Sequence, residues 1–249
     1  MAETKPVLNY ARYYQRWNDA DPETETRRLD YFQRLLGTMR PEDLSQPVLD
    51  VGCGCGHLLE VLRRSGCSSL LGVDRDPDLV AATRARGLNA ELVEDAVDHL
   101  LAAGGRYALI CACDVLEHFP RERQLPLVRA LAGALRPGGQ LLLSVPNANS
   151  AIAARWRYND LTHYASFTEC SLDHILHLGG LQDIRIGPFE LMAPPPRPWL
   201  PSLWQARWLM LKSLRCLQRL EMVLEFGRRQ GSAIPLSPNL RATARAASS

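Results

Sequence analysis

From Pro47 onward, short apolar runs alternate with segments whose apolar residues recur at helical spacing. An uninterrupted apolar run is typical of a strand buried on both faces, and strands separated by helices favour a parallel sheet. The pattern predicts an α/β fold: a doubly wound, Rossmann-like, mostly parallel seven-stranded sheet with helices on both faces. The runs that predict its strands cover residues 47–52, 69–74, 89–95, 107–114, 139–147, 181–191 and 239–246.

The first predicted turn, within VLDVGCGCG at residues 48–56, contains glycines at 52, 54 and 56. Glycine has no Cβ, so such a turn can lie against a bulky ligand, and the free N–H groups of the following helix can meet electronegative atoms. The spacing is not that of the dinucleotide motif GxGxxG, whose last glycine would fall where His57 stands. A phosphate-binding GK[ST] motif is also missing from this turn.

Bulk composition narrows the function further. The chain has 249 residues, 46% of them hydrophobic, which suffices for one large domain with elaborations or two small ones. A formal charge of +2 with no dense basic run disfavours nucleic acid as a partner. The seven cysteines lack zinc-finger spacing, so we expect free thiols in a reducing cytosol and no metal site. The chain shows neither a secretory signal nor a run of roughly 20 apolar residues, which predicts a cytoplasmic protein.

Five ordered motifs between residues 47 and 147 resemble those of class I S-adenosylmethionine-dependent methyltransferases: VLDVGCGCG, LLGVDRDP, VEDA, CACDVLEHF and LRPGGQLLLSVPN. The resemblance implies S-adenosylmethionine as cofactor and an antiparallel last strand. It also implies a role for each matching residue. Asp50 and the loop of Gly52, Cys53, Gly54 and Gly56 would contact the amino-acid part of the cofactor, and Asp74 would bind its ribose. Arg75 would lie along the adenine, and Asp95 and Ala96 would contact the amino edge of the adenine. Cys113 and Asp114 would form the far wall of the cofactor site.

Asp74 has a competing interpretation as the N-cap of the helix that follows it. Asp76 fits that local role better, because Pro77 comes directly after it and proline is favoured at the first helical position. We therefore expect Asp74 to serve the cofactor and Asp76 to cap the helix.

Two histidines are candidate bases for a hydroxyl acceptor, because the pKa of histidine suits proton transfer near neutral pH. His118 lies in DVLEHF at the exit of the fourth strand, and His163 lies in RYNDLTHYASFT after the fifth. Asp160 would orient His163 or bind an acceptor hydroxyl; alternatively Asp160 and Thr162 build a turn and His163 packs beneath it. The second stretch resembles a segment of the ubiquinone-pathway-like superfamily, including members from polysaccharide-biosynthesis clusters.

Two regions lie outside this catalytic pattern. Residues 1–45 are expected to form a helical lid, with Tyr14 over the cofactor; simple core packing is the alternative. The methyltransferase domain would then cover residues 46–249, with a helical, Trp-rich insertion at about 192–235. An apolar stripe and an excess of basic residues make the 199–229 segment a candidate for peripheral membrane contact, for covering the acceptor pocket or for a homodimer seam.

The insertion, RYNDLTHYASFT and the ending IPLSPNLRATAR together resemble methyltransferases of bacterial lipopolysaccharide and surface-glycan pathways. This resemblance implies an O-methyltransferase whose acceptor is a sugar hydroxyl of a small-molecule or lipid-linked glycan in bacterial lipopolysaccharide synthesis. Such an enzyme would work in the cytoplasm or at the inner face of the cytoplasmic membrane. The alternatives are a methyltransferase for a quinone or another small aromatic metabolite, and a non-catalytic scaffold subunit with the same fold.

Overall fold

The computed structural model describes residues 22–194 and 202–248, so Tyr14 and the rest of the expected lid before Pro22 lie outside the described residues. The chain divides into two compact units. Unit 1 contains Met1–Cys113, Arg129–Leu142 and Arg245–Ser249, and unit 2 contains Asp114–Val128 and Leu143–Ala244.

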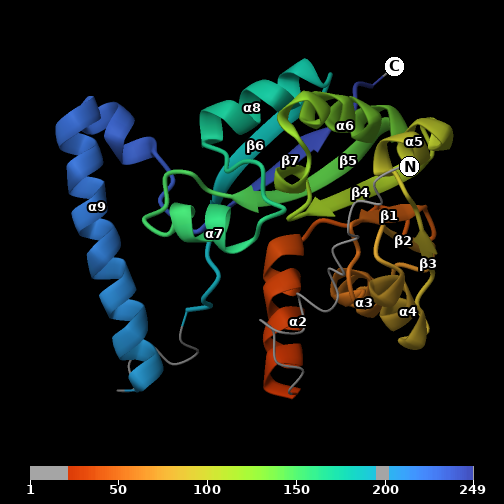
Figure 1. The fold of residues 1–249 in the computed structure, drawn as a ribbon, viewed down its shortest axis with the longest axis horizontal. Coiled ribbons are helices and arrows are strands. Elements are labelled where there is room, and N and C mark those ends of the chain that lie inside the picture. Colours follow the sequence, from red (N-terminus) through yellow and green to blue (C-terminus); the bar gives the residue numbers. More distant parts are fainter. Residues whose placement is uncertain (1–21, 195–201, 249) are drawn as a thin grey trace, which may run out of the picture. The chain divides into compact units, whose positions relative to one another are not determined.

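A seven-stranded sheet with the order β3-β2-β1-β4-β5-β7-β6 forms the framework (Figure 1). It is mostly parallel, its last strand is antiparallel, and helices cover it, which confirms the predicted fold class. The strands are β1 (Val48–Val51), β2 (Leu70–Asp74), β3 (Ala90–Leu92), β4 (Tyr107–Cys113), β5 (Leu135–Pro146), β6 (Gln182–Phe189) and β7 (Asn239–Arg245).

In unit 1, β1 is the buried centre of the parallel strands. Val48 is in register with Leu70 of β2 and Leu109 of β4, and all four residues of β1 are buried. Because parallel strands in register end at the same edge, the residues that follow β1, β2, β3 and β4 gather there. The sheet therefore places the glycine loop and the end of β2 side by side.

Among the helices of unit 1, α4 begins at the residue that the sequence indicates. Asp76 caps α4 by accepting hydrogen bonds from Asp78 N and Leu79 N, at 2.9 and 3.3 Å. This confirms the capping role expected for Asp76 and leaves the Asp74 carboxylate for other partners. The helices are α2 (Pro22–Leu36), α3 (His57–Arg64), α4 (Pro77–Ala85) and α5 (Ala96–Ala103), while α6 (Arg121–Ala134) belongs partly to each unit.

Unit 2 holds most of the elements after the fourth strand, and β5 is divided between the two units. The elements of unit 2 are η1 (Leu116–His118), α7 (Ala153–Asn159), α8 (Glu169–Leu178), β6, α9 (Leu203–Ala233) and β7 up to Ala244. A capping box starts α8, in which Thr168 Oγ1 accepts from Ser171 N and Ser171 Oγ accepts from Thr168 N. The stretch 157–168, which carries His163, begins inside α7 and becomes irregular from Asp160.

The segment between β6 and β7 contains the long helix α9, which Ser202 caps by accepting from Gln205 N. The helix bends at Gly227, whose φ of 77° and ψ of 160° suit only glycine. Beyond the bend the chain folds back on itself, and a Cβ at Gly231 would stand 2.4 Å from Met222 O. Within the described residues, no helix has both the length and the apolar character needed to span a bilayer.

Candidate functional site

The loop between β1 and α3 carries the three glycines of the GxGxG motif. Gly52, Gly54 and Gly56 have φ values of 69°, 53° and 77°, a conformation that other residues rarely adopt. Thr83 anchors the loop from α4, because its Oγ1 donates to Gly54 O at 2.7 Å. A Cβ at Gly56 would stand 2.9 Å from Thr83 Cγ2, whereas one at Gly54 would meet no described atom within 4 Å. The loop is therefore crowded at Gly56 and open at Gly54.

Asp74 lies directly beside this loop. Its Oδ2 accepts a hydrogen bond from Gly54 N at 2.9 Å, and its Oδ1 accepts one from Asp76 N at 3.0 Å. Burial raises the pKa of the Asp74 carboxyl, and these backbone hydrogen bonds act in the opposite direction. The carboxylate thus braces the loop and keeps acceptor capacity at the loop's edge, where a ribose hydroxyl could bind.

The side chain of Cys53 is buried in the core. It packs in a buried cluster with Leu59, Val80 and Leu88, and burial raises the pKa of its thiol. Gly72 of β2 makes room for it, since a Cβ there would stand 2.7 Å from Cys53 Sγ. Cys53 can therefore serve a cofactor through its backbone, and Gly72 is a supporting residue that sequence reasoning missed.

Asp50 supplies a second buried carboxyl, within β1. Burial, followed by the nearby Asp74, raises its pKa well above the ordinary value. A cation beside such a group would favour its ionised form. The ammonium group of an amino acid has the complementary charge.

The remaining cofactor candidates of unit 1 follow the aligned strand ends. Arg75 is exposed just after β2. Asp95 caps α5 through a 2.8 Å hydrogen bond from Val97 N, and Ala96 is the first residue of that helix. Cys113 ends β4. The structure brings these residues to one edge of the sheet. A surface hollow of about 620 Å³, lined by residues such as Val48, Leu70 and Tyr107, lies instead at the amino ends of the strands.

Asp114, the first residue of unit 2, is held in a strained conformation. Its φ is 55°, which is uncommon for a residue other than glycine. Its Oδ1 accepts from Ser144 Oγ at 3.0 Å and from Asn239 Nδ2 at 3.1 Å. Strain that several contacts maintain is frequent at functional positions.

The histidine candidates of unit 2 come together. His118 Nδ1 and Thr162 Oγ1 are 2.7 Å apart, and Thr162 Oγ1 donates to Asp160 Oδ1 at 2.6 Å. Because the threonine proton goes to the carboxylate, His118 Nδ1 is the donor to Thr162, which leaves the lone pair of the ring on Nε2. The three residues form one hydrogen-bonded chain across 44 positions of sequence.

His163 sits against this chain without joining it. Its Nδ1 donates to Trp156 O at 2.9 Å, and its Nε2 is 3.8 Å from Asp160 Oδ2, beyond hydrogen-bonding distance. Its ring meets that of His118 edge-on, with centroids 4.5 Å apart. Burial alone would raise the pKa of Asp160, but hydrogen bonds from Thr162 and the two imidazoles lower it. Asp160 does build the turn that the sequence suggested, since it also accepts from Thr162 N.

Glu117 is a further member of the cluster that sequence reasoning missed. Its side chain is fully buried, and neither carboxyl oxygen has a hydrogen-bond partner in the described residues. Burial, with Asp114 and Asp160 nearby, raises its pKa well above the ordinary value, which favours the neutral form. Ligand atoms of Glu117, His118 and His163 lie within 4.8 Å of one another, so this set could hold a divalent cation, although the cysteine and histidine spacing predicted no metal.

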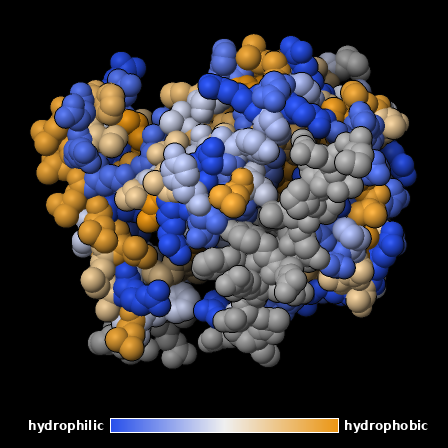
Figure 2. Space-filling view, viewed as in Figure 1, coloured by the Kyte–Doolittle hydropathy of each residue, from blue (hydrophilic) through white to orange (hydrophobic). Residues whose placement is uncertain are grey.

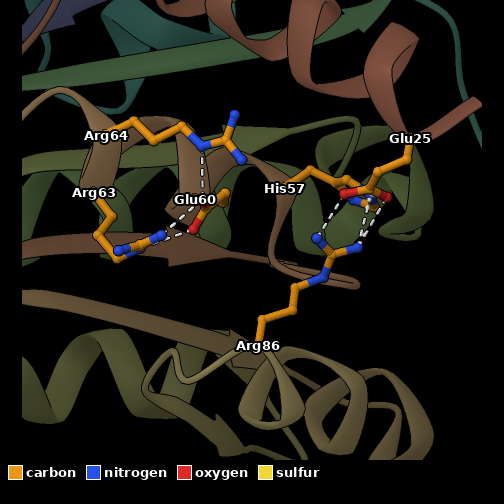
Figure 3. Close-up of polar contacts among 6 residues, drawn as sticks. All are labelled: Glu25, His57, Glu60, Arg63, Arg64 and Arg86. Atoms are coloured by element: carbon orange, nitrogen blue, oxygen red, sulfur yellow. Dashed lines mark hydrogen bonds and ion pairs between the residues drawn. The ribbon is translucent and has the colours of Figure 1, made fainter. Parts of the chain in front are cut away.

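A polar network also ties α2 to the start of α3 within unit 1 (Figure 3). Glu25 lies 2.8 Å from His57 Nε2 and accepts two hydrogen bonds from Arg86, at 2.6 and 3.0 Å. His57 immediately follows Gly56, so the network fixes α2 beside the cofactor loop. These residues are far apart in the chain and form no motif, so the sequence carried no signal for the contact.

The residues of unit 1 fit the cofactor that the motifs imply. The loop is open at Gly54, and the carboxylate of Asp74 and the carboxyl of Asp50 have the chemistry to meet ribose hydroxyls and an ammonium group.

Comparisons with known proteins match this chain to methyltransferases. The family model described as "Methyltransferase domain" matches residues 14–186. The ubiquinone biosynthesis O-methyltransferase of Xanthomonas axonopodis pv. citri is 33% identical over 151 residues, which are 58% of this chain and 62% of that protein. That of Xanthomonas oryzae pv. oryzae matches to the same extent. The match thus spans less than two thirds of the length of these curated relatives.

Solved structures share the fold at low identity. A SAM-dependent methyltransferase from Archaeoglobus fulgidus has a TM-score of 0.65 and 20% identity, covering 95% of this chain and 99% of its own. A methyltransferase in complex with the Haloferax volcanii Trm112 activator has a TM-score of 0.68 and 17% identity, with coverages of 97% and 99%.

Proposed function

Because this chain belongs to the methyltransferase domain family, in the class I S-adenosylmethionine-dependent superfamily, we propose that it is an O-methyltransferase in which His118 removes the proton of an acceptor hydroxyl. The observation that carries the proposal is the hydrogen-bonded chain from Asp160 through Thr162 to His118. An O-methyltransferase needs such a base, because a hydroxyl must lose its proton as it gains the methyl group.

S-adenosylmethionine supplies an activated methyl group on a positively charged sulfur. The residues of the chain then have to bind the acceptor, orient its hydroxyl and take up one proton. Asp160, through Thr162, holds His118 in the tautomer whose Nε2 can take that proton. The carboxylate of Asp160 also stabilises the imidazolium that results, as an acid behind a histidine does in other enzymes. His163, edge-on to His118, limits how the ring of His118 can turn.

On the cofactor side, we propose that Asp74 binds the ribose hydroxyls and that Asp50 and the glycine loop bind the amino-acid part. Arg75, Asp95, Ala96, Cys113 and Asp114 would complete the site, and Tyr14 would cover it. The support for Asp74 is its hydrogen bond to Gly54 N, which ties the carboxylate to the glycine loop.

A sugar hydroxyl is the first candidate acceptor. Side chains of unit 2 gathered around His118 are polar: two carboxyls, a second imidazole and a hydroxyl. Such groups suit an acceptor with several hydroxyls. The second candidate is a quinol or related phenol, which the likeness to ubiquinone biosynthesis O-methyltransferases favours.

The test offers the purified chain S-adenosylmethionine with nucleotide sugars, lipid-linked glycans and quinols, and follows methyl transfer by mass spectrometry. Methylation of a hydroxyl in any of these classes supports the proposal, and the accepted class decides between the two candidates. Methylation only at nitrogen or carbon acceptors would refute it. Cofactor binding in calorimetry without any transfer would favour the scaffold alternative.

The base is tested in the same assay with matched histidine variants. His118→Gln should lower kcat by about 10²–10⁴-fold with the cofactor Kd unchanged. Thr162→Val should lower kcat less and shift the pH profile, because His118 loses its link to Asp160. Retained turnover in His118→Gln, with turnover lost in His163→Gln, would move the role to His163.

A further inference from the structure

The apolar side chains of α9 are exposed over most of the helix. Among the described residues, 17 large hydrophobic side chains are exposed, and ten of them belong to α9. Figure 2 shows apolar residues gathered along this helix, at the left of the view. A contiguous apolar patch of this kind marks an interaction surface. The ten are Leu203, Trp204, Leu209, Met210, Leu211, Leu214, Leu217, Leu220, Leu224 and Phe226.

The polar side of α9 faces its own unit. Arg215 forms an ion pair with Glu190. Gln218 Nε2 donates to Asn149 O at 2.7 Å, and Arg219 Nη1 donates to Gly231 O at 2.6 Å. The contacts of Arg215 and Gln218 with residues outside α9 fix the rotation of the helix about its axis, so its apolar side is turned outward.

The outward side has the spacing of a coiled-coil seam. Leu203, Met210, Leu217 and Leu224 recur every seven residues, and Ala206, Ser213 and Leu220 each follow three residues later. All seven are exposed. A seven-residue repeat of large residues, with Ala206, Ser213 and Leu220 between them, fits the knobs-into-holes packing of a second helix. A flat lipid surface does not require this narrow repeat.

Charges beside the seam select the partner helix. Arg207 and Glu221 each directly follow a seam position, and Leu214 lies midway between them on the same flank. When two copies of α9 pair antiparallel about a two-fold axis, Arg207 of each copy meets Glu221 of the other. Anionic lipid is a poorer match, because Glu221 borders the apolar side and Arg215 and Arg219 are turned inward.

We propose that α9 is a homodimer interface, in which the seam of Leu203 to Leu224 packs antiparallel against α9 of a second copy. Cys216, which is exposed, lies next to the centre of this seam. The two-fold axis therefore brings the Cys216 thiols of the two copies near each other.

Analytical ultracentrifugation of the full chain tests the proposal, with an expected mass of about twice the 27.8 kDa of one chain. Leu217→Arg in the seam should raise the dimer Kd about tenfold or more. Leu211→Arg is the matched control, because Leu211 is also exposed on α9 but lies outside the seam. Circular dichroism verifies that both variants are folded.

Charge reversal tests the orientation. Arg207→Glu and Glu221→Arg should each weaken the dimer, and the double reversal should restore it. In a Cys170→Ser background, a short bismaleimide should link two chains through Cys216, and Cys216→Ser should abolish the link. A wild-type chain that stays monomeric at its highest soluble concentration would overturn the proposal. Binding of that monomer to anionic vesicles, lost in Leu217→Arg, would assign the surface to a membrane instead.

Discussion

Replacing Glu25 with glutamine should loosen α2 from the start of α3, because Glu25 joins α2 to both His57 and Arg86. The hydrogen bonds from Arg86, opposed by burial and assisted by His57, lower the pKa of Glu25 from 4.5 to about 2. At about 1.36 kcal/mol per pH unit, such a shift corresponds to at most about 3 kcal/mol of stability. The side chain is 37% exposed, so solvent screening reduces this to about 1 kcal/mol.

The pH dependence has a defined sign. The folded-state pKa of Glu25 is depressed, so its contribution is complete above pH 4.5 and is lost as the pH falls toward about 2. Burial lowers the folded-state pKa of His57 from its ordinary value of 6.5. The contribution of His57 to stability is therefore complete above pH 6.5 and is lost as the pH falls below that value. Glu25 opposes the lowering at His57, and its removal should therefore make the loss of stability below pH 6.5 steeper.

Urea denaturation and hydrogen exchange measure the two effects. At pH 7, Glu25→Gln should lower the free energy of unfolding by about 1 kcal/mol and the Tm by about 2–4 °C. Hydrogen exchange of the α2 amides should become about fivefold faster, because about 1 kcal/mol of lost stability raises the equilibrium constant for local opening by that factor. Glu60→Gln is the matched control, since Glu60 pairs only with Arg63 and Arg64 of its own helix in Figure 3. Equal α2 exchange in the two variants would refute the reasoning.

Three further outcomes are expected. Asp74→Ala should weaken S-adenosylmethionine binding in calorimetry by about tenfold or more, because the carboxylate that accepts from the ribose hydroxyls is removed and Gly54 N loses its partner. Unchanged affinity would reject the assignment of Asp74 to the ribose. Gly56→Ala should cost about 2–4 kcal/mol in urea denaturation, whereas Gly87→Ala, with a similar φ but open space, should cost only about 1–2 kcal/mol; equal costs would contradict the crowding at Thr83. Treatment with a chelator should leave the rate of methyl transfer unchanged. If activity were lost and divalent cations restored it, the cluster of Glu117, His118 and His163 would be assigned as a metal site.

Local features of the sequence determined the framework of the protein. The order of apolar runs and helical segments predicts the parallel sheet, because burial on both faces removes the polar alternation of a half-exposed strand. The glycine triplet predicts a close-approach loop, since only glycine readily adopts positive φ at every second position. Asp76 followed by Pro77 predicts the start of α4. Each of these interactions spans only a few residues, so each leaves a pattern in the chain.

Contacts between distant segments were decided only by the tertiary structure. The sequence suggested that Asp160 orients His163, but the structure links Asp160 through Thr162 to His118, 44 residues away from Thr162. No sequence pattern predicted the hydrogen bonds of Glu25 with His57 and Arg86 either. On α9, periodicity showed that an apolar side exists, but not which way it faces. That direction depends on Glu190 and Asn149, whose positions relative to the helix arise only when the chain folds.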